Sequence, residues 1–390
     1  GWMALSGADA GAMPTPDTIW DIQGADILTP STPVTLTWNN GQGLNFIHEV
    51  SVDDDFLFTI KQSVENTSGQ DVTLRPYGLL RRHGEPSDAK NFFILHEGVM
   101  RMSDGELSED GYGDVSGYDI DPREGTHADR QDVEVSGWIG FTDHYWMSIL
   151  APQKGNGFRS TVKYFEESDI YQTEAVLAPI TVSNGTAAGA TTQLFVGAKE
   201  WETIRAYENA GIEGFLDSID WGWFFFITKP MFAVLHWLNV LIGNMGWAII
   251  GLTLLIKALL FPLAYKSYVS MAKMKELQPE MEKIKKQAGD DRQKMQQMTM
   301  KLYQEKKVNP AAGCLPILVQ IPIFFSLYKV IFVTLELRHA PWFGWIKDLS
   351  APDPSSIWNL FGMLPYSTPS PESIFAFVAL GILPILLGIS

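Results

Sequence analysis

Two different hydrophobic patterns divide the chain. Between residues 33 and 66 apolar and polar positions alternate, as in PVTLTW, where Val34, Leu36 and Trp38 alternate with threonines. Side chains of a strand point alternately to opposite faces, so a period of two predicts β-strands. Further strand candidates lie at 71–82, 134–141, 145–151, 160–165, 171–184 and 191–198. Many short strands separated by turn-forming clusters predict a large β-sandwich.

Two segments of this first half depart from the alternation. Residues 104–134 are acidic and rich in glycine, and they predict a long exposed excursion. Residues 199–218 predict a helix followed by a linker.

The second half carries long apolar runs. Residues 221–243 are rich in aromatic side chains, and their polar side predicts an amphipathic helix at the membrane interface, with a full span as the alternative. The 22 residues of 244–265 reach ~33 Å as a helix, enough to cross a bilayer core. Residues 312–335 predict a second span, and 373–390 predict the start of a third.

Charge separates the same two halves. Residues 1–220 hold 13 Lys and Arg against 35 Asp and Glu, whereas residues 221–390 hold 16 against 10. The segment 266–311 has 11 basic and 6 acidic residues. The positive-inside rule therefore places 266–311 in the cytoplasm, and the acidic first half on the opposite side.

The cytoplasmic segment has a heptad-like pattern. Apolar residues recur at steps of three and four on both sides of a turn at 289–291, which predicts two antiparallel helices, the first beginning near Pro279. The candidate partner-binding residues of this hairpin are Met274, Met281, Lys285, Lys286, Met295 and Met298. Methionine adapts to variable apolar partners. A plain hairpin core with a solvated basic face is the alternative interpretation.

Lys257 is the residue with the strongest functional signal. It interrupts an apolar run nine residues before Lys266, ~13 Å along a helix, which is farther than a lysine stem reaches. A lysine at this depth costs ~2.5–3.5 kcal/mol and normally faces a polar cavity or a partner of opposite charge. A deep snorkelling anchor remains the alternative. Thr253, one turn away, and Gln320 in the second span are expected to line the same positively charged recess.

Other chemistry is sparse. His48 and His96 are each followed by glutamate, so a membrane-tethered, carbohydrate-binding or mutarotase-like sandwich is a second hypothesis. The sequence has no phosphate-binding loop or metal-ligand spacing, and we expect neither a cofactor nor an enzymatic activity. An ion-coupled transporter would need acidic residues near the midplane, and the spans have none.

The single cysteine, Cys314, excludes an internal disulfide. No signal peptide is visible, and both ends look like cuts in a longer chain.

Several long motifs point to one family. The stretches KVNPAAGCLPILVQIPIF and LRHAPWFGWIKDLSAPDP, together with YKSYVSMAKMKELQPEMEKIKK, resemble the YidC/Oxa/Alb family of membrane insertases in its Gram-negative form. The resemblance is strong over about 215–390. Residues 1–214 resemble the family's periplasmic β-sandwich by position and composition only.

The resemblance implies an inner-membrane protein that inserts and helps fold other membrane proteins. Five core helices of the family enclose a hydrophilic groove, in which a positive residue, usually arginine but here Lys257, attracts acidic residues of the client. Implied partners are nascent membrane proteins, the Sec translocon, the ribosome or the signal recognition particle pathway, and the lipid bilayer, but no specific nucleic-acid sequence.

The expected fold is a multidomain α+β membrane protein. The expected segments are a periplasmic sandwich (1–214), a linker and interfacial helix (215–243), a transmembrane helix (244–268), a cytoplasmic helical hairpin (269–311), a second transmembrane helix (312–336), a periplasmic loop (337–371) and the start of a further transmembrane helix (372–390).

Overall fold

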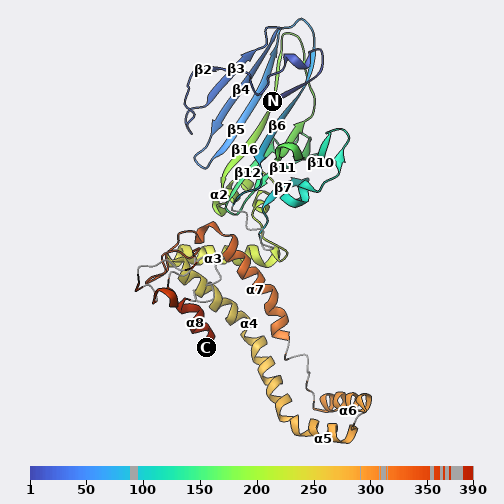
Figure 1. Cartoon of the computed structure of the whole chain (residues 1–390), viewed down its shortest axis with the longest axis vertical. Coiled ribbons are helices and arrows are strands. Elements are labelled where there is room, and N and C mark those ends of the chain that lie inside the picture. Colours follow the sequence, from blue (N-terminus) through green and yellow to red (C-terminus); the bar gives the residue numbers. More distant parts are fainter. Residues whose placement is uncertain are drawn as a thin grey trace. The chain divides into compact units, whose positions relative to one another are not determined.

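The computed structural model of the chain forms two compact units, Gly1–Asp220 and Trp221–Ser390. It describes residues 1–87, 95–289, 291–306, 308, 313, 315–351, 355–360, 363–364, 369 and 381–389. Figure 1 shows strands in the first unit and helices in the second. The change of element type follows the change of hydrophobic period in the sequence.

The first unit is built from antiparallel strands. They are β1 (Trp2–Ser6), β2 (Asp21–Gln23), β3 (Val34–Asn39), β4 (Leu44–Val52), β5 (Leu57–Asn66), β6 (Val72–His83), β7 (Gly98–Ser103), β8 (Glu106–Gly111), β9 (Ile120–Asp121), β10 (Thr126–Val133), β11 (Gly137–Thr142), β12 (Trp146–Pro152), β13 (Phe158–Phe165), β14 (Ile170–Leu177), β15 (Ile180–Val182) and β16 (Ala187–Ala198). One sheet has the order β2-β3-β4-β5-β16-β12-β11-β7-β8. The other has the order β1-β6-β14-β13-β10-β9, with β15 also paired to β6.

The strand register explains the core between these sheets. Trp38 pairs with Phe46, and Phe46 pairs with Val64, so the three side chains lie side by side on one face. Phe46 and Val64 are fully buried and pack with Trp2 and Leu74 of the other sheet. The alternation seen at 33–66 thus determines which face of these strands is buried.

The prediction for residues 104–134 is wrong. This stretch forms β8, the short helix α1 (Tyr112–Ser116), β9 and β10, and Tyr112, Val115 and Val133 are buried in the core. The strands are short and rich in charge, so apolar and polar positions do not alternate regularly along them. One charged side chain of β10 has a partner on the other sheet, because Asp129 forms an ion pair with Arg101 on β7.

Residues 199–220 belong to the sandwich. The segment forms α2 (Trp201–Asn209) and the 3₁₀ turn η3 (Phe215–Ser218). Phe215 is fully buried, packs edge-to-face on Trp138, and extends the first unit beyond the expected boundary at 214. The hydroxyl of Tyr207 donates to Asp53 Oδ2 at 2.7 Å, which ties α2 to the β4–β5 turn.

The second unit is helical. Its helices are α3 (Phe225–Ile242), α4 (Met245–Glu276), α5 (Gln278–Ala288), α6 (Arg292–Glu305), α7 (Leu315–Val333) and α8 (Ile382–Ile389). Three of them, α3, α4 and α7, are long and apolar enough to cross a membrane. The expected segment 372–390 is described only over 381–389, so its first half lies outside the described residues.

Helix α4 differs from the prediction in length. It does not end at 268 but continues past the internal Pro262 to Glu276, and α5 begins directly after it with Pro279 in its first turn. At ~1.5 Å per residue, its 32 residues reach ~48 Å, well beyond a bilayer core of ~30 Å. Met274 therefore lies on α4, and the two hairpin helices, α5 and α6, follow it.

Helix α3 is amphipathic in its packing. Met231, Phe232 and Leu235 are buried against the rest of the unit, while Trp237 and Val240 on the opposite side are more than half exposed. Its partners are α4 and α7, both of which it contacts extensively.

Candidate functional site

The predicted site begins on one face of α4. Thr253 and Lys257 are one turn apart, so their side chains leave the helix on the same side. The Lys257 side chain is exposed and Thr253 is half-buried. The Thr253 hydroxyl donates to the Ile249 carbonyl at 2.9 Å, so it satisfies its donor within its own helix. Lys257 is therefore the polar group on this face that is accessible to a partner.

Helix α7 runs antiparallel to α4, and two contacts fix the pairing. The Ser267 hydroxyl donates to the Gly313 carbonyl at 3.3 Å near one end. At the other end, Gly246 lies against the ring of Trp342, which follows α7. Measured from Ser267, Lys257 is ~15 Å along α4.

Gln320 lies on α7, ~10 Å from Gly313 by the same rise. Its side chain is half-buried. Because Lys257 lies ~15 Å along α4 from Ser267, the partner of Gly313, Gln320 is about one helical turn closer to the hairpin end than Lys257. Within the described residues, no hydrogen bond joins Gln320 to Lys257 or Thr253. The structure therefore places the three residues on two packed helices at neighbouring depths, without a direct bond among them.

The apolar helices supply no countercharge for Lys257. Helices α3 and α7 contain no Asp or Glu, and the one acidic residue of α4 is Glu276, 19 residues or ~29 Å beyond Lys257. Among the described residues, Lys257 forms no ion pair. Its ammonium group can be neutralised by an acidic group that enters from outside these helices.

A second lysine, Lys329, lies ~24 Å along α7 from Gly313 and is thus ~9 Å farther from the hairpin than Lys257. It differs from Lys257 because it is buried, with 6% of its surface exposed. The Lys329 stem packs against Gly222, where an added Cβ would be 3.3 Å from Lys329 Cε. Of the two deep lysines, Lys257 is therefore the accessible one.

Several contacts that fix these helices were not predicted. His236 Nδ1 on α3 is 2.8 Å from Glu336 Oε1, just past α7, and both side chains are less than one-fifth exposed. The Asn244 amide donates to the carbonyls of Pro341 and Trp342 and its Oδ1 accepts from the Trp247 amide, so it caps α4 while binding the loop after α7. These partners are about 100 residues apart in sequence, so no local pattern indicates them.

The candidate hairpin residues fall into two groups. Met281 on α5 and Met295 on α6 are half-buried where the two helices face each other, and Met298 on α6 and Met274 on α4 are also half-buried. Lys285 and Lys286 are exposed on α5. The hairpin therefore combines an incompletely covered methionine seam with a basic outer face.

The sandwich histidines do not form the acid–base set that a sugar epimerase needs. His48 on β4 stacks on Trp20 at 4.5 Å, and burial lowers its pKa to about 4. Its neighbour Glu49 is on the opposite face, 4.0 Å from Lys61. His96 precedes β7, where its Nε2 is 2.9 Å from the Val99 carbonyl, and burial also holds its pKa below the ordinary value. Each histidine has a local structural partner.

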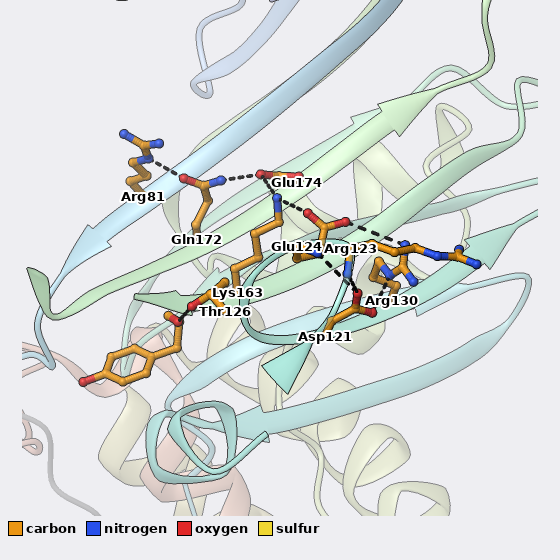
Figure 2. A network of polar contacts seen from close by, with 10 residues as sticks. Arg81, Asp121, Arg123, Glu124, Thr126, Arg130, Lys163, Gln172 and Glu174 are labelled. Carbon is orange, nitrogen blue, oxygen red and sulfur yellow. Dashed lines mark hydrogen bonds and ion pairs between the residues drawn. The ribbon is translucent and has the colours of Figure 1, made fainter. Parts of the chain in front are cut away.

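A larger polar network lies on the outer face of the β6-β14-β13-β10 sheet (Figure 2). It connects Arg81, Gln172, Glu174, Lys163, Glu124, Arg130 and Asp121. Lys163 Nζ is 2.7 Å from both Glu124 and Glu174. Burial favours the neutral lysine, but these two hydrogen bonds outweigh it and raise the pKa of Lys163. The opposite charges satisfy one another, which fits a structural role.

Within the described residues, no group of three or more His, Cys, Asp or Glu side chains could hold a metal ion.

Comparison with known proteins covers the whole chain. Residues 1–234 match the family model described as the YidC periplasmic domain, and residues 237–390 match the model described as the 60Kd inner membrane protein. Proteins named membrane protein insertase YidC from Ruegeria sp. (strain TM1040) and Roseobacter denitrificans are 64% and 63% identical over all 390 residues. The chain spans 64% of the length of these relatives.

Among solved structures, the chain is similar to one titled active YidC insertase with the first transmembrane domain resolved. The match has a TM-score of 0.34 and 21% identity, and it covers 98% of this chain and 78% of that one. Together the two family models account for nearly every residue of the sandwich and of the helices. The chain belongs to the YidC family, as a multi-pass inner membrane protein whose β-sandwich is the periplasmic domain.

Proposed function

We propose that the protein inserts nascent membrane proteins into the inner membrane and assists their folding, without covalent chemistry. The observation that carries this proposal is Lys257, an exposed cation within the longest apolar helix that has no acidic residue within ~29 Å along that helix. The relatives named membrane protein insertase support it.

The physical role of Lys257 is to lower the cost of moving a polar tail. An acidic side chain that enters the hydrocarbon region alone pays a desolvation cost of several kcal/mol. A lysine that is already present offers a charge-assisted hydrogen bond at mid-depth, so the client's carboxylate is partly compensated while it passes. Thr253 and Gln320 add polar lining at neighbouring depths.

Partners on either side of the membrane extend the proposal. The acidic sandwich is periplasmic, so a hairpin beyond one crossing of α4 faces the cytoplasm, where the 11 basic residues of the segment 266–311 satisfy the positive-inside rule. There it is positioned to meet a ribosome or the signal recognition particle pathway. We further propose that the protein acts alone or with the Sec translocon.

The test is Lys257→Ala in the natural full-length protein, with a client whose translocated tail carries two acidic residues. Insertion should fall at least tenfold at equal expression, whereas Lys257→Arg, which keeps the charge, should retain it. Lys266→Ala, on the same helix nearer its cytoplasmic end, is the matched control and should have little effect. Normal insertion by Lys257→Ala would refute the role of Lys257.

A client with an uncharged tail distinguishes the loss of the Lys257 charge from general structural damage caused by Lys257→Ala. It should be inserted equally by the natural protein and by Lys257→Ala, because no carboxylate needs compensation.

A further inference from the structure

The seam between the two hairpin helices is unevenly filled. At its base Leu277 and Leu302 are each 7% exposed, and at its tip Ala288 is 8% exposed. Between these closed ends Met281 and Met295 are only half-buried, and Met300 is 53% exposed. The middle of the seam is thus less covered than either of its ends.

The open middle of the seam is a hollow of about 560 Å³ between α5 and α6. Figure 1 shows the two helices lying side by side beyond the end of α4. The residues that line the hollow are Met281, Glu282, Lys285, Arg292, Met295, Gln296, Thr299 and Met300. Both helices thus contribute, and three thioether side chains form its apolar surface. A hollow of this size accommodates apolar side chains that one helix presents at i, i+3 and i+4.

Methionine at these positions favours many partners over one. Its side chain is unbranched and polarizable, so it adapts to apolar surfaces of different shape. A permanent partner would be matched better by leucine or isoleucine, which have fewer accessible rotamers and fill a fixed shape. The lining therefore fits a succession of different apolar helices.

Charge at the edge of the hollow specifies the partner further. Lys285 and Arg292 are both exposed there, against one acid, Glu282. The neighbouring acid Glu280 is already held by Lys306 at 3.0 Å, so it does not offset the two cations. The edge attracts an acidic residue next to an apolar segment, whereas nucleic acid has no apolar side chains to fill the methionine surface.

We propose that this hollow, which we name the methionine hollow, is a docking site for an apolar helical segment of a client polypeptide that carries an adjacent carboxylate. The inference rests on the proposed insertase function, and it assigns to the hairpin a first binding step. The same client chemistry, apolar with an acidic residue, is then what Lys257 meets inside the membrane.

The experiment uses the natural full-length protein in nanodiscs, with a photo-crosslinking amino acid in place of Thr299. The probe is a 20-residue Leu/Ala helical peptide with one terminal Asp, and a second peptide has Lys in its place. The Asp peptide should crosslink at position 299 and should do so more than the Lys peptide.

Paired variants test each part of the hollow. Met281→Ser with Met295→Ser should weaken binding of the Asp peptide at least tenfold, while Met281→Leu with Met295→Leu should retain it and shows that the hairpin still folds. Lys285→Glu with Arg292→Glu should reverse the preference, so that the Lys peptide crosslinks more. The matched control, Lys283→Glu with Lys294→Glu, changes the same helices outside the hollow and should have little effect.

Lys257→Ala distinguishes this inference from the proposed function. Crosslinking at position 299 should persist in that variant even where insertion is lost. Equal crosslinking of both peptides, or equal effects of the Lys285/Arg292 and Lys283/Lys294 pairs, would overturn the proposal and favour a diffuse basic surface such as one that binds ribosomal RNA.

Discussion

The two units treat the same residue types in opposite ways. In the sandwich, Phe46 is fully buried and Lys163 lies between two carboxylates. In the helical unit, Phe261 is 65% exposed and Lys257 has an accessible, unpaired ammonium group among the described residues. Water surrounds the first unit and lipid the long apolar helices of the second, so apolar side chains go inside in one and remain outside in the other. Burial is thus informative about function only when the solvent is known.

The largest contrast is expected for one substitution made in both units. Phe46→Ala should reduce the free energy of unfolding of the sandwich by about 3–5 kcal/mol, because it leaves a cavity in a closed core. Phe261→Ala should change the free energy of unfolding of the helical unit by less than about 0.5 kcal/mol, since lipid or detergent fills the space. Urea unfolding of the detergent-solubilised chain, followed by tryptophan fluorescence, measures both. Equal losses at the two sites would contradict the comparison.

Ion pairs should show a similar difference. Lys163→Met leaves Glu174, only 7% exposed, without its cation and should cost about 3–5 kcal/mol of sandwich stability. Lys306→Met in the hairpin should cost at most about 0.5 kcal/mol, because both partners of that pair are nearly half exposed. Thermal unfolding of the two variants under identical conditions is the measurement. A Lys163→Met variant as stable as the parent would show that the network is dispensable.

The sandwich should lose stability in acid through His48. Burial lowers its folded-state pKa to about 4, below the ordinary 6.5, so between these values only the unfolded chain binds the proton. The contribution of His48 to the free energy of unfolding is therefore complete above pH 6.5. As the pH drops from 6.5 to about 4, the free energy of unfolding decreases by up to about 1.4 kcal/mol per pH unit, and below pH 4 His48 causes no further decrease. His48→Gln should flatten the profile in this window. An unchanged slope would exclude His48 as its cause.

The smallest effect compares two glycines of α4. A Cβ at Gly246 would be 2.3 Å from Trp342, so Gly246→Ala should cost about 1–3 kcal/mol by displacing the indole ring. At Gly251 the nearest atom would be 3.6 Å away, and Gly251→Ala should gain up to about 1 kcal/mol from helix propensity. Thermal stability in nanodiscs should therefore change in opposite directions. A shift in the same direction for both would show that the Trp342 contact does not constrain α4.

Local patterning determined the order of sandwich, apolar helices and basic hairpin. A period of two or a long apolar run is contained within some 20 residues, so it is visible without the fold. Lys257 was detectable in the same way, because a charge within an apolar run needs no partner to stand out. The start of α5 near Pro279 followed from the restricted backbone of proline.

Tertiary structure decided whatever depended on distant partners. The strands between 106 and 133 have too much charge to show alternation. They form because they pair with strands outside this stretch and because Tyr112, Val115 and Val133 enter the core between the sheets. The pair of His236 and Glu336 joins residues 100 positions apart, and the open methionine hollow depends on how α5 packs on α6. A sequence lists the groups that can interact, but only the folded chain sets which of them meet and which remain available to a client.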